Sequence, residues 1–263
     1  MSLPGHVPSK EADTADVAPE LYFNKRTYKT FPVACPATDK TEGLDLSANS
    51  VASPSVPVYR ALVCIPADLL PGAYQLKAAG CERQIQVMPG GFGVQRLRLP
   101  SDKDNFLASP GEEEAVNKAK ETVTAERFWS GKFSQPCKAR VSAQFGLRRI
   151  VNGRLLSDYF HSGLDYAGIL GASVRAAQSG RVLMAHSGWR LHGNTICIDH
   201  GQGVVSFYIH LKDILVKPGQ TVRAGDLIGR VGRSGRANGP HLHFSIYVNA
   251  DAANPLDWFG RVF

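Results

Sequence analysis

The sequence of 263 residues has no long hydrophobic run and no dense block of basic residues. No stretch approaches the ~18 apolar residues that a membrane-spanning helix needs, so we expect no membrane span. The formal net charge of +7 at pH 7 favours anionic partners, such as acidic lipid, nucleic acid or an anionic polymer. Because lysine and arginine are dispersed along the chain, we do not expect nucleic acid to be the partner. The hydrophobic content of 43% is typical of a soluble protein with one large domain or two modest ones.

Two further features are missing from the sequence. The first 20 residues, "MSLPGHVPSKEADTADVAPE", lack the apolar core of a signal peptide. The protein is therefore either cytosolic or a mature form from which an export signal has been removed. No CxxC spacing occurs, and the number of cysteines is odd, so free thiols and one or two disulfides both stay open. The five cysteines are Cys35, Cys64, Cys81, Cys137 and Cys197.

Changes in residue pattern divide the chain into four segments. Short extended runs broken by Pro/Gly turns, as in "LLPGAY", predict strands in the first half, and dense turn signals predict an all-β fold again from Cys137 onward. We therefore expect a mainly β protein. Its segments are a flexible tail (1–20), a small β-sandwich-like module (21–100), a linker that contains a helix (101–135) and a second β domain (136–263).

One helix is predicted, over "SPGEEEAVNKAKETVTAERF" at residues 109–128. Ser109 can cap its amino end, Pro110 suits its first turn, and Glu112 completes a capping box three residues after Ser109. We expect this helix to join the two β domains.

The stretch "GPHLHFSIYV", residues 239–248, alternates as a strand does. Its apolar side chains point to one face, where they can pack in a core: Leu242, Phe244, Ile246 and Val248. His241 and His243 then stand side by side on the other face. Two imidazoles this close indicate a metal site, although a half-exposed strand with two histidines is an equally simple interpretation.

Two more stretches carry candidate functional residues. "HSGLDY" places His161 and Asp165 four residues apart across a glycine. In "GVVSFYIHL" the alternation predicts a strand that buries Val205, Phe207 and Ile209 and presents Tyr208 and His210 on its other face. The remaining histidines show no comparable pattern and are expected in the tail or in loops: His6, His186, His192 and His200.

These residues match what a hydrolytic zinc site requires. Such a site has three protein ligands and an open position for water, together with groups that move a proton and stabilise an anionic intermediate. His161, Asp165 and His243 would meet the first need, and His210 and His241 the second. Two histidines and one carboxylate also form the facial triad of non-haem iron oxygenases, but such a triad leaves the two extra histidines unexplained.

Six motifs follow one another between Gln144 and Pro255: "FGLRRIVNG", "HSGLDYAG", "GNTICIDHGQG", "FYIHL", "VKPGQTVRAGDLIGRVGRSG" and "GPHLHF". Through them the carboxy-terminal half closely resembles metallopeptidase family 23, the lysostaphin/LytM type of zinc endopeptidase. Upstream, "YRALVCIPADLLPG" and "FWSGKFSQP" look like the amino-terminal module and linker of some bacterial members. The resemblance implies an antiparallel β-sheet with a groove over the metal. It also implies that His161, Asp165 and His243 bind zinc, and that His210 and His241 serve as general base and transition-state stabiliser.

Two departures from the family pattern bear on the cleft. Many members read HLHFE where this chain has "HLHFS", and alternation places Ser245 on the metal-facing side. Some members carry a tyrosine before the GN, where this chain has "GWRLHGN". We therefore expect Trp189 or His192 to line the cleft, with an effect on substrate preference.

By this resemblance we expect a zinc-dependent endopeptidase, with one zinc per chain, that hydrolyses peptide cross-links of bacterial peptidoglycan. The alternative is a non-catalytic LytM-like domain that binds the cell wall or activates a partner hydrolase. Such proteins generally lack some site residues, whereas all five are present here. The expected partner is the peptidoglycan stem peptide, the expected location periplasmic or extracellular, and the expected state a monomer.

Overall fold

The computed structural model describes residues 18–33, 58–101 and 107–263. His6, Cys35 and all but the end of the predicted tail lie outside these residues. The chain divides into two compact units, one of residues 1–61 with 76–83 and the other of residues 62–75 with 84–263. No disulfide joins the four cysteines within the described ranges.

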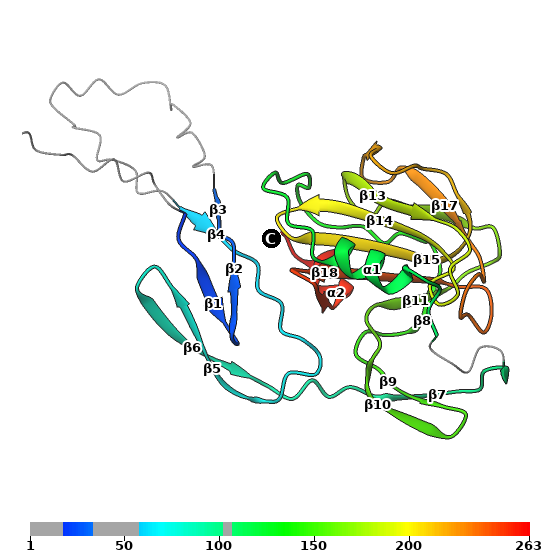
Figure 1. The fold of residues 1–263 in the computed structure, drawn as a ribbon, viewed down its shortest axis with the longest axis horizontal. Coiled ribbons are helices and arrows are strands. Elements are labelled where there is room, and N and C mark those ends of the chain that lie inside the picture. Colours follow the sequence, from blue (N-terminus) through cyan, green and yellow to red (C-terminus); the bar gives the residue numbers. More distant parts are fainter. Residues whose placement is uncertain (1–17, 34–57, 102–106) are drawn as a thin grey trace, which may run out of the picture. The chain divides into compact units, whose positions relative to one another are not determined.

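The smaller unit contains short strands, and Phe23 in one of them has no exposed surface. A four-stranded sheet has the order β2-β1-β5-β6, and its β5 and β6 extend beyond residues 76–83 (Figure 1). Its strands are β1 (Leu21–Phe23), β2 (Arg26–Tyr28), β5 (Gly72–Ala78) and β6 (Cys81–Val87), and a separate pair is formed by β3 (Phe31–Pro32) and β4 (Tyr59–Arg60). The described residues of this part of the chain thus form short strands, in line with the expectation of a mainly β protein.

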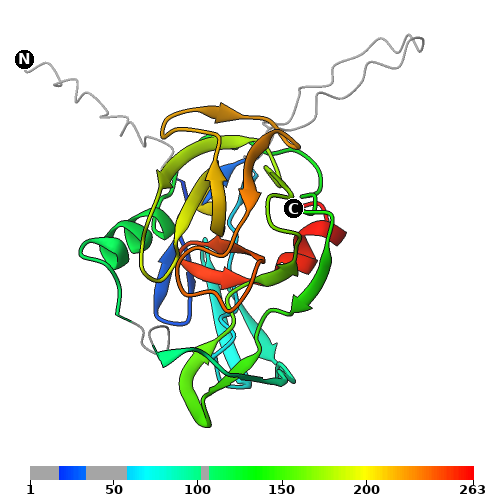
Figure 2. The same ribbon diagram turned by 90° about the vertical axis from the view of Figure 1, so that its right-hand side faces the viewer.

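The larger unit contains a ten-stranded sheet whose main path is β16-β13-β14-β15-β18-β11-β8. Figure 2 shows the strong twist of this sheet, as expected of antiparallel strands. Its strands are β8 (Arg140–Ala143), β11 (Leu164–Ala167), β12 (Ser173–Arg175), β13 (Gly180–His186), β14 (Asn194–Gly201), β15 (Val204–Ile214), β16 (Thr221–Val222), β17 (Leu227–Val231), β18 (Leu242–Val248) and β19 (Asp251–Ala253).

The larger unit also contains a three-stranded sheet of order β10-β9-β7. It contains β7 (Val94–Leu97), β9 (Arg148–Val151) and β10 (Arg154–Phe160). Because β7 pairs in parallel with β9, residues 84–100 belong to the larger unit. This division differs from the module boundary predicted at residue 100, since a pairing between strands so far apart in sequence leaves no local signal.

Helix α1 (Glu112–Lys120) starts where the sequence predicts but ends well before residue 128. The β-branched run that follows favours extended backbone, and Arg127 forms an antiparallel bridge with Gly201 of β14. The predicted Ser109 cap is also wrong, because the Ser109 hydroxyl accepts a hydrogen bond from the Arg190 N–H instead. The other half of the capping box is present, as Glu112 accepts from the Ser109 N–H at 2.8 Å.

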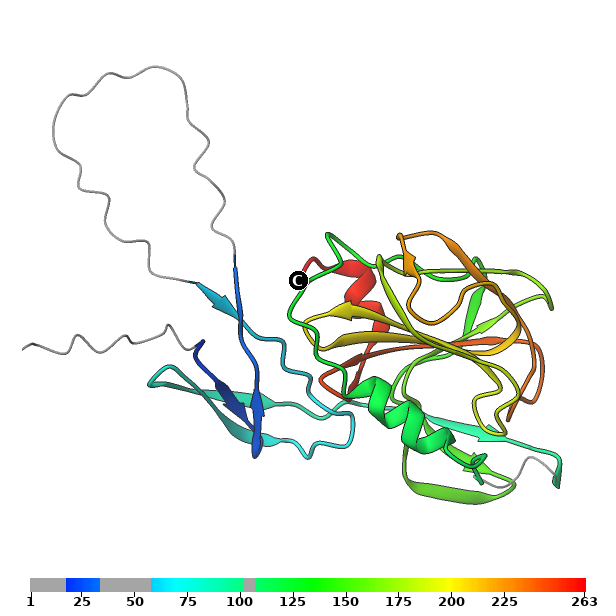
Figure 3. The same ribbon diagram turned by 45° about the horizontal axis from the view of Figure 1, so that its top comes forward.

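Two helices pack on opposite faces of the main sheet (Figure 3). Trp258 of α2 (Pro255–Gly260) belongs to the larger core cluster, and Val116 and Ala119 of α1 belong to a second cluster. The predicted alternation of β18 is confirmed, since all four of its apolar residues lie in the larger cluster: Leu242, Phe244, Ile246 and Val248. The opposite face of β18 is also buried, because α1 lies over it.

His200 is a correction to the expectation that it lies in a loop. It lies in β14 with no exposed surface, its Nδ1 2.7 Å from the Ser179 carbonyl oxygen and its Nε2 2.8 Å from the Ser206 hydroxyl. Burial lowers the pKa of His200 from 6.5 to about 4, although the hydrogen bond to Ser179 opposes this shift. The imidazole is therefore neutral in the folded protein at neutral pH.

This buried imidazole predicts a loss of stability in acid. Because the folded-state pKa lies below the unfolded value, the contribution of His200 to the free energy of unfolding is highest above pH 6.5 and falls until about pH 4. One unit of pKa shift corresponds to about 1.4 kcal/mol, so His200 should contribute a loss of about 3 kcal/mol over this range. Urea denaturation between pH 7 and pH 4.5 should show a shallower pH dependence for His200→Gln than for wild type. Equal slopes for the two proteins would contradict the assignment.

Candidate metal centre and active-site cleft

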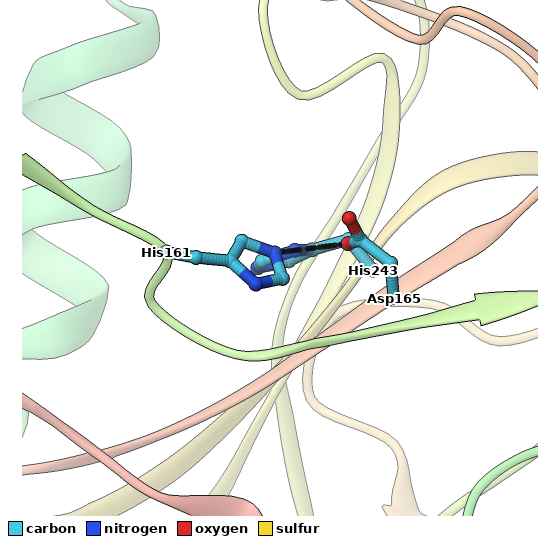
Figure 4. Close-up of side chains that lie close together, drawn as sticks. All are labelled: His161, Asp165 and His243. Carbon is cyan, nitrogen blue, oxygen red and sulfur yellow. Dashed lines mark hydrogen bonds and ion pairs between the residues drawn. The ribbon is translucent and has the colours of Figure 1, made fainter. Parts of the chain in front are cut away.

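Three predicted site residues meet at one point (Figure 4). Asp165 of β11 lies opposite His243 of β18 in the strand pairing, so their side chains share a face. His161 follows the end of β10. The loop between His161 and Asp165 passes so close to β18 that a Cβ at Gly163 would lie 2.1 Å from the Phe244 carbonyl oxygen. One donor atom from each of the three side chains lies within 4.8 Å of the others.

The hydrogen bonds of this cluster suit a bound cation. His161 Nδ1 is 2.7 Å from the Gln144 carbonyl oxygen, which can only accept, so Nδ1 carries the proton and Nε2 has a lone pair. That Nε2 is 3.0 Å from both Asp165 Oδ1 and His243 Nδ1, and the last two atoms are 2.8 Å apart. Electron-rich atoms converge here in a buried place. The imidazole and carboxylate donors fit a divalent zinc ion.

Arg149 of β9 holds the carboxylate from outside the cluster. Its Nη2 donates to Asp165 Oδ2 at 3.2 Å and its Nη1 to the Tyr159 hydroxyl at 3.0 Å, which leaves Oδ1 directed at the histidines. Burial alone would raise the pKa of Asp165, but its contacts with His161 and His243 lower it well below its usual range. Burial also lowers the pKa of His243 to about 4. Asp165 is therefore an anion and His243 a neutral ligand at neutral pH.

His210 reaches the same site through a β-bulge. Tyr208 lies opposite Ile196 and Leu211 opposite Asn194, so two residues of β15, Ile209 and His210, face the single residue Thr195 of β14. The backbone of His210 has a φ of 63°, outside the strand region. Such bulges re-aim a side chain next to active sites. Here the bulge lets Ile209 and His210 line the same cavity.

Because of this bulge, the side chains of β15 do not lie on the two faces as predicted. Val205, Phe207 and Ile209 are buried as expected, but under α1 and on the face that His243 shares. Tyr208, expected beside His210, is instead buried in the larger core, where its hydroxyl accepts from the Ala177 N–H at 2.8 Å. The simple alternation fails at His210 because it does not count the extra residue.

A cavity of about 590 Å³ lies over the cluster. Asp165 and His243 line it together with both of the other predicted site residues, His210 and His241, whereas His161 lies behind with no exposed surface. The rings of His210 and His241 have centroids 4.8 Å apart.

These two histidines are oriented alike. His210 Nδ1 lies 2.9 Å from the Ser234 carbonyl oxygen, and His241 Nδ1 lies 2.9 Å from that of Gly239. Each Nδ1 therefore carries the proton, which leaves Nε2 as a proton acceptor. Burial, followed by the neighbouring His241 and His243, lowers the pKa of His210 well below its usual range. Both imidazoles can exchange a proton with a group bound in the cavity.

The two departures from the family pattern, at Ser245 and in "GWRLHGN", both lie near the cavity. His192 lines the cavity, whereas Trp189 does not and instead stacks on the exposed His186. Ser245 lines a small adjoining pocket with His243. Sequence reasoning missed Arg149 and Tyr159, although Arg149 stands within the quoted "FGLRRIVNG".

Comparison with known proteins agrees with this geometry. Residues 159–255 match the sequence profile of peptidase family M23, and all five predicted site residues lie within that range. The larger unit carries an M23 peptidase domain. Relatives include peptidoglycan DD-endopeptidase ShyC of Vibrio cholerae, 38% identical over 118 residues, and DD-carboxypeptidase/endopeptidase Mpg of Neisseria meningitidis, 38% identical over 117 residues. Each alignment covers 44% of this chain and 26% of the relative.

A crystal structure described as an M23 peptidase of Pseudomonas aeruginosa has a similar fold. It superposes with a TM-score of 0.63 at 23% identity, and the match covers 92% of this chain and 87% of that one. The likeness therefore extends beyond the M23 domain to most of the described chain.

Among the described residues, no helix has the length and apolar character needed to cross a membrane.

Proposed function

We propose that this protein is a zinc-dependent endopeptidase that hydrolyses peptide cross-links of bacterial peptidoglycan. The observation that carries the proposal is the cavity in which Asp165 and His243 of the metal cluster meet His210 and His241. ShyC and Mpg, which share the M23 domain, are named as peptidoglycan DD-endopeptidase and DD-carboxypeptidase/endopeptidase. The chain spans about a quarter of the length of each.

In this proposal His161, Asp165 and His243 hold one zinc ion. Bound zinc would supply a Lewis acid for the scissile carbonyl and a water whose pKa is lowered to about 7. Asp165 contributes the negative charge of the ligand set, and Arg149 keeps its Oδ2 occupied so that Oδ1 points to the metal position. The Gln144 carbonyl fixes the ring of His161.

His210 and His241 are the proposed acid–base groups. Nε2 of one imidazole accepts a proton from the attacking water and later returns it to the leaving amine. The other imidazole, when Nε2 is protonated as well as Nδ1, donates a hydrogen bond from Nε2 to the negative charge that develops on the carbonyl oxygen of the scissile peptide. Their Nδ1–H groups are held by the Ser234 and Gly239 carbonyls, so the rings need not reorganise during the reaction.

The test is a digest of purified peptidoglycan with the zinc-loaded protein. We expect soluble muropeptides to be released, release to stop after chelation, and zinc to restore it. Asp165→Ala serves as the matched inactive control. Restoration by ferrous iron and oxygen alone would favour the oxygenase alternative instead. Binding to the insoluble wall without release would favour a non-catalytic role.

The proposed substrate also places the protein outside the cytoplasm. Peptidoglycan lies beyond the cytoplasmic membrane, so we propose a periplasmic or extracellular location and a monomer that acts on stem peptides. Fractionation of the source cells should find the protein in the envelope or the medium. Recovery in the cytosol alone would contradict this location, and analytical ultracentrifugation would test the monomer.

A further inference from the structure

Helix α1 precedes the M23 domain in sequence, yet it places a buried carboxylate beside the cleft. Glu112 has no exposed surface although it is ionisable. It accepts hydrogen bonds from the N–H groups of Ser109 at 2.8 Å, Leu191 at 3.1 Å and His192 at 2.8 Å. His192 Nδ1 also lies 2.7 Å from Glu112 Oε1. Buried carboxylates are rare unless their oxygens are occupied in this way.

The loop that Glu112 holds is joined in turn to His210. The His192 carbonyl oxygen accepts a hydrogen bond from the His210 N–H at 3.0 Å, at the bulge that interrupts the pairing of β15 with β14. The Leu191 carbonyl accepts from the Arg236 N–H at 2.9 Å, two residues beyond Ser234. Ser234 itself binds the imidazole of His210. The backbone and the ring of His210 are thus both connected to residues 191–192.

We propose that Glu112 is a positioning residue for His210. Its carboxylate fixes the loop at residues 191–192, and the loop holds the bulge that directs the His210 imidazole into the cavity. This inference rests on the proposed function of the site and adds to it a residue from outside residues 159–255.

The chemistry of the cluster requires a carboxylate in particular. Four nitrogens converge on two oxygens that only accept, so an amide at this position would turn an N–H group toward another N–H group. A donor left without an acceptor in a buried place is costly, and the loop would move to relieve it. The helix itself should stay in place, because Val116 and Ala119 pack on the sheet independently of Glu112.

The test compares Glu112→Gln and Glu112→Ala with Glu114→Gln, an exposed carboxylate in the same first turn of α1. In the Glu112 variants we expect kcat to fall by up to roughly 100-fold, the loss that a displacement of about 1 Å can cause at a catalytic group. KM and zinc content should stay near wild type, because the ligand set is untouched. Glu114→Gln should behave as wild type.

A second measurement separates positioning from a general structural role. In zinc-loaded protein labelled with ¹⁵N-histidine, the His210 imidazole and amide signals should shift in Glu112→Gln, while those of His161 and His243 stay in place. Unchanged His210 signals would overturn the inference, as would a wild-type kcat. A fall in kcat that only follows lost zinc or lost folded protein would also overturn it. If wild type cleaves nothing, the proposed function fails, and the signals still decide whether Glu112 positions His210.

Discussion

Asp165→Ala is expected to abolish zinc binding and, with it, cleavage of peptidoglycan. Asp165 supplies the only negative charge of the ligand set, and its Oδ1 lies within 3.0 Å of both histidine donor atoms. Two neutral imidazoles alone hold a divalent ion weakly. Zinc stoichiometry after dialysis and muropeptide release should therefore both fall to background. Asp213→Ala, which removes a half-exposed carboxylate beside Arg230, is the matched control and should keep both.

The same variant should also lose stability, for a reason that lies outside the metal site. Removal of Asp165 leaves Arg149, whose side chain is only 12% exposed, without its carboxylate partner. Breaking a buried ion pair from one side costs up to about 3–5 kcal/mol. The double variant Asp165→Ala/Arg149→Met should recover much of the melting temperature without recovering zinc. Full zinc occupancy in either variant would remove Asp165 from the ligand set.

The residues that the sequence brings together are those whose spacing is local. Alternation along β18 predicts which face of the strand carries His243. The four-residue spacing in "HSGLDY" brings Asp165 close to His161, because the chain turns tightly at Gly163. Both patterns depend on neighbouring residues in one strand or one turn. For that reason a single sequence is enough to predict them.

The features that escaped prediction depend on pairings between distant segments. The bulge at His210 is visible only in the register between β14 and β15, so the alternation of β15 alone places His210 on the face of Tyr208, whereas Tyr208 lies in the larger core and His210 lines the cavity. Glu112 and His192 are separated by 80 residues. A capping box explains Glu112 without reference to the cleft, which is why sequence reasoning missed its contact with the loop.

His210→Ala and His241→Ala are expected to separate metal binding from chemistry. Neither imidazole belongs to the cluster of three donors, so both variants should keep one zinc per chain. Peptidoglycan cleavage should nevertheless fall by ~10²–10⁴-fold, the contribution of a positioned acid–base group. His210 is expected to have the larger effect on folding, because its backbone forms the bulge, so His210→Asn is a useful second variant. Asparagine tolerates a positive φ better than alanine does.

Leu242→Ala, between the two strand histidines, should give the opposite pattern. Leu242 has no exposed surface and lies in the larger core cluster, so truncation leaves a cavity that costs roughly 2–5 kcal/mol of unfolding free energy. The histidine side chains on the other face keep their positions, so zinc content and cleavage per folded molecule should stay near wild type. His210→Ala, His241→Ala and Leu242→Ala should be compared by zinc stoichiometry, melting temperature and muropeptide release. Loss of zinc in His210→Ala would make His210 a ligand, and undiminished cleavage by both histidine variants would overturn the proposed mechanism even with zinc bound.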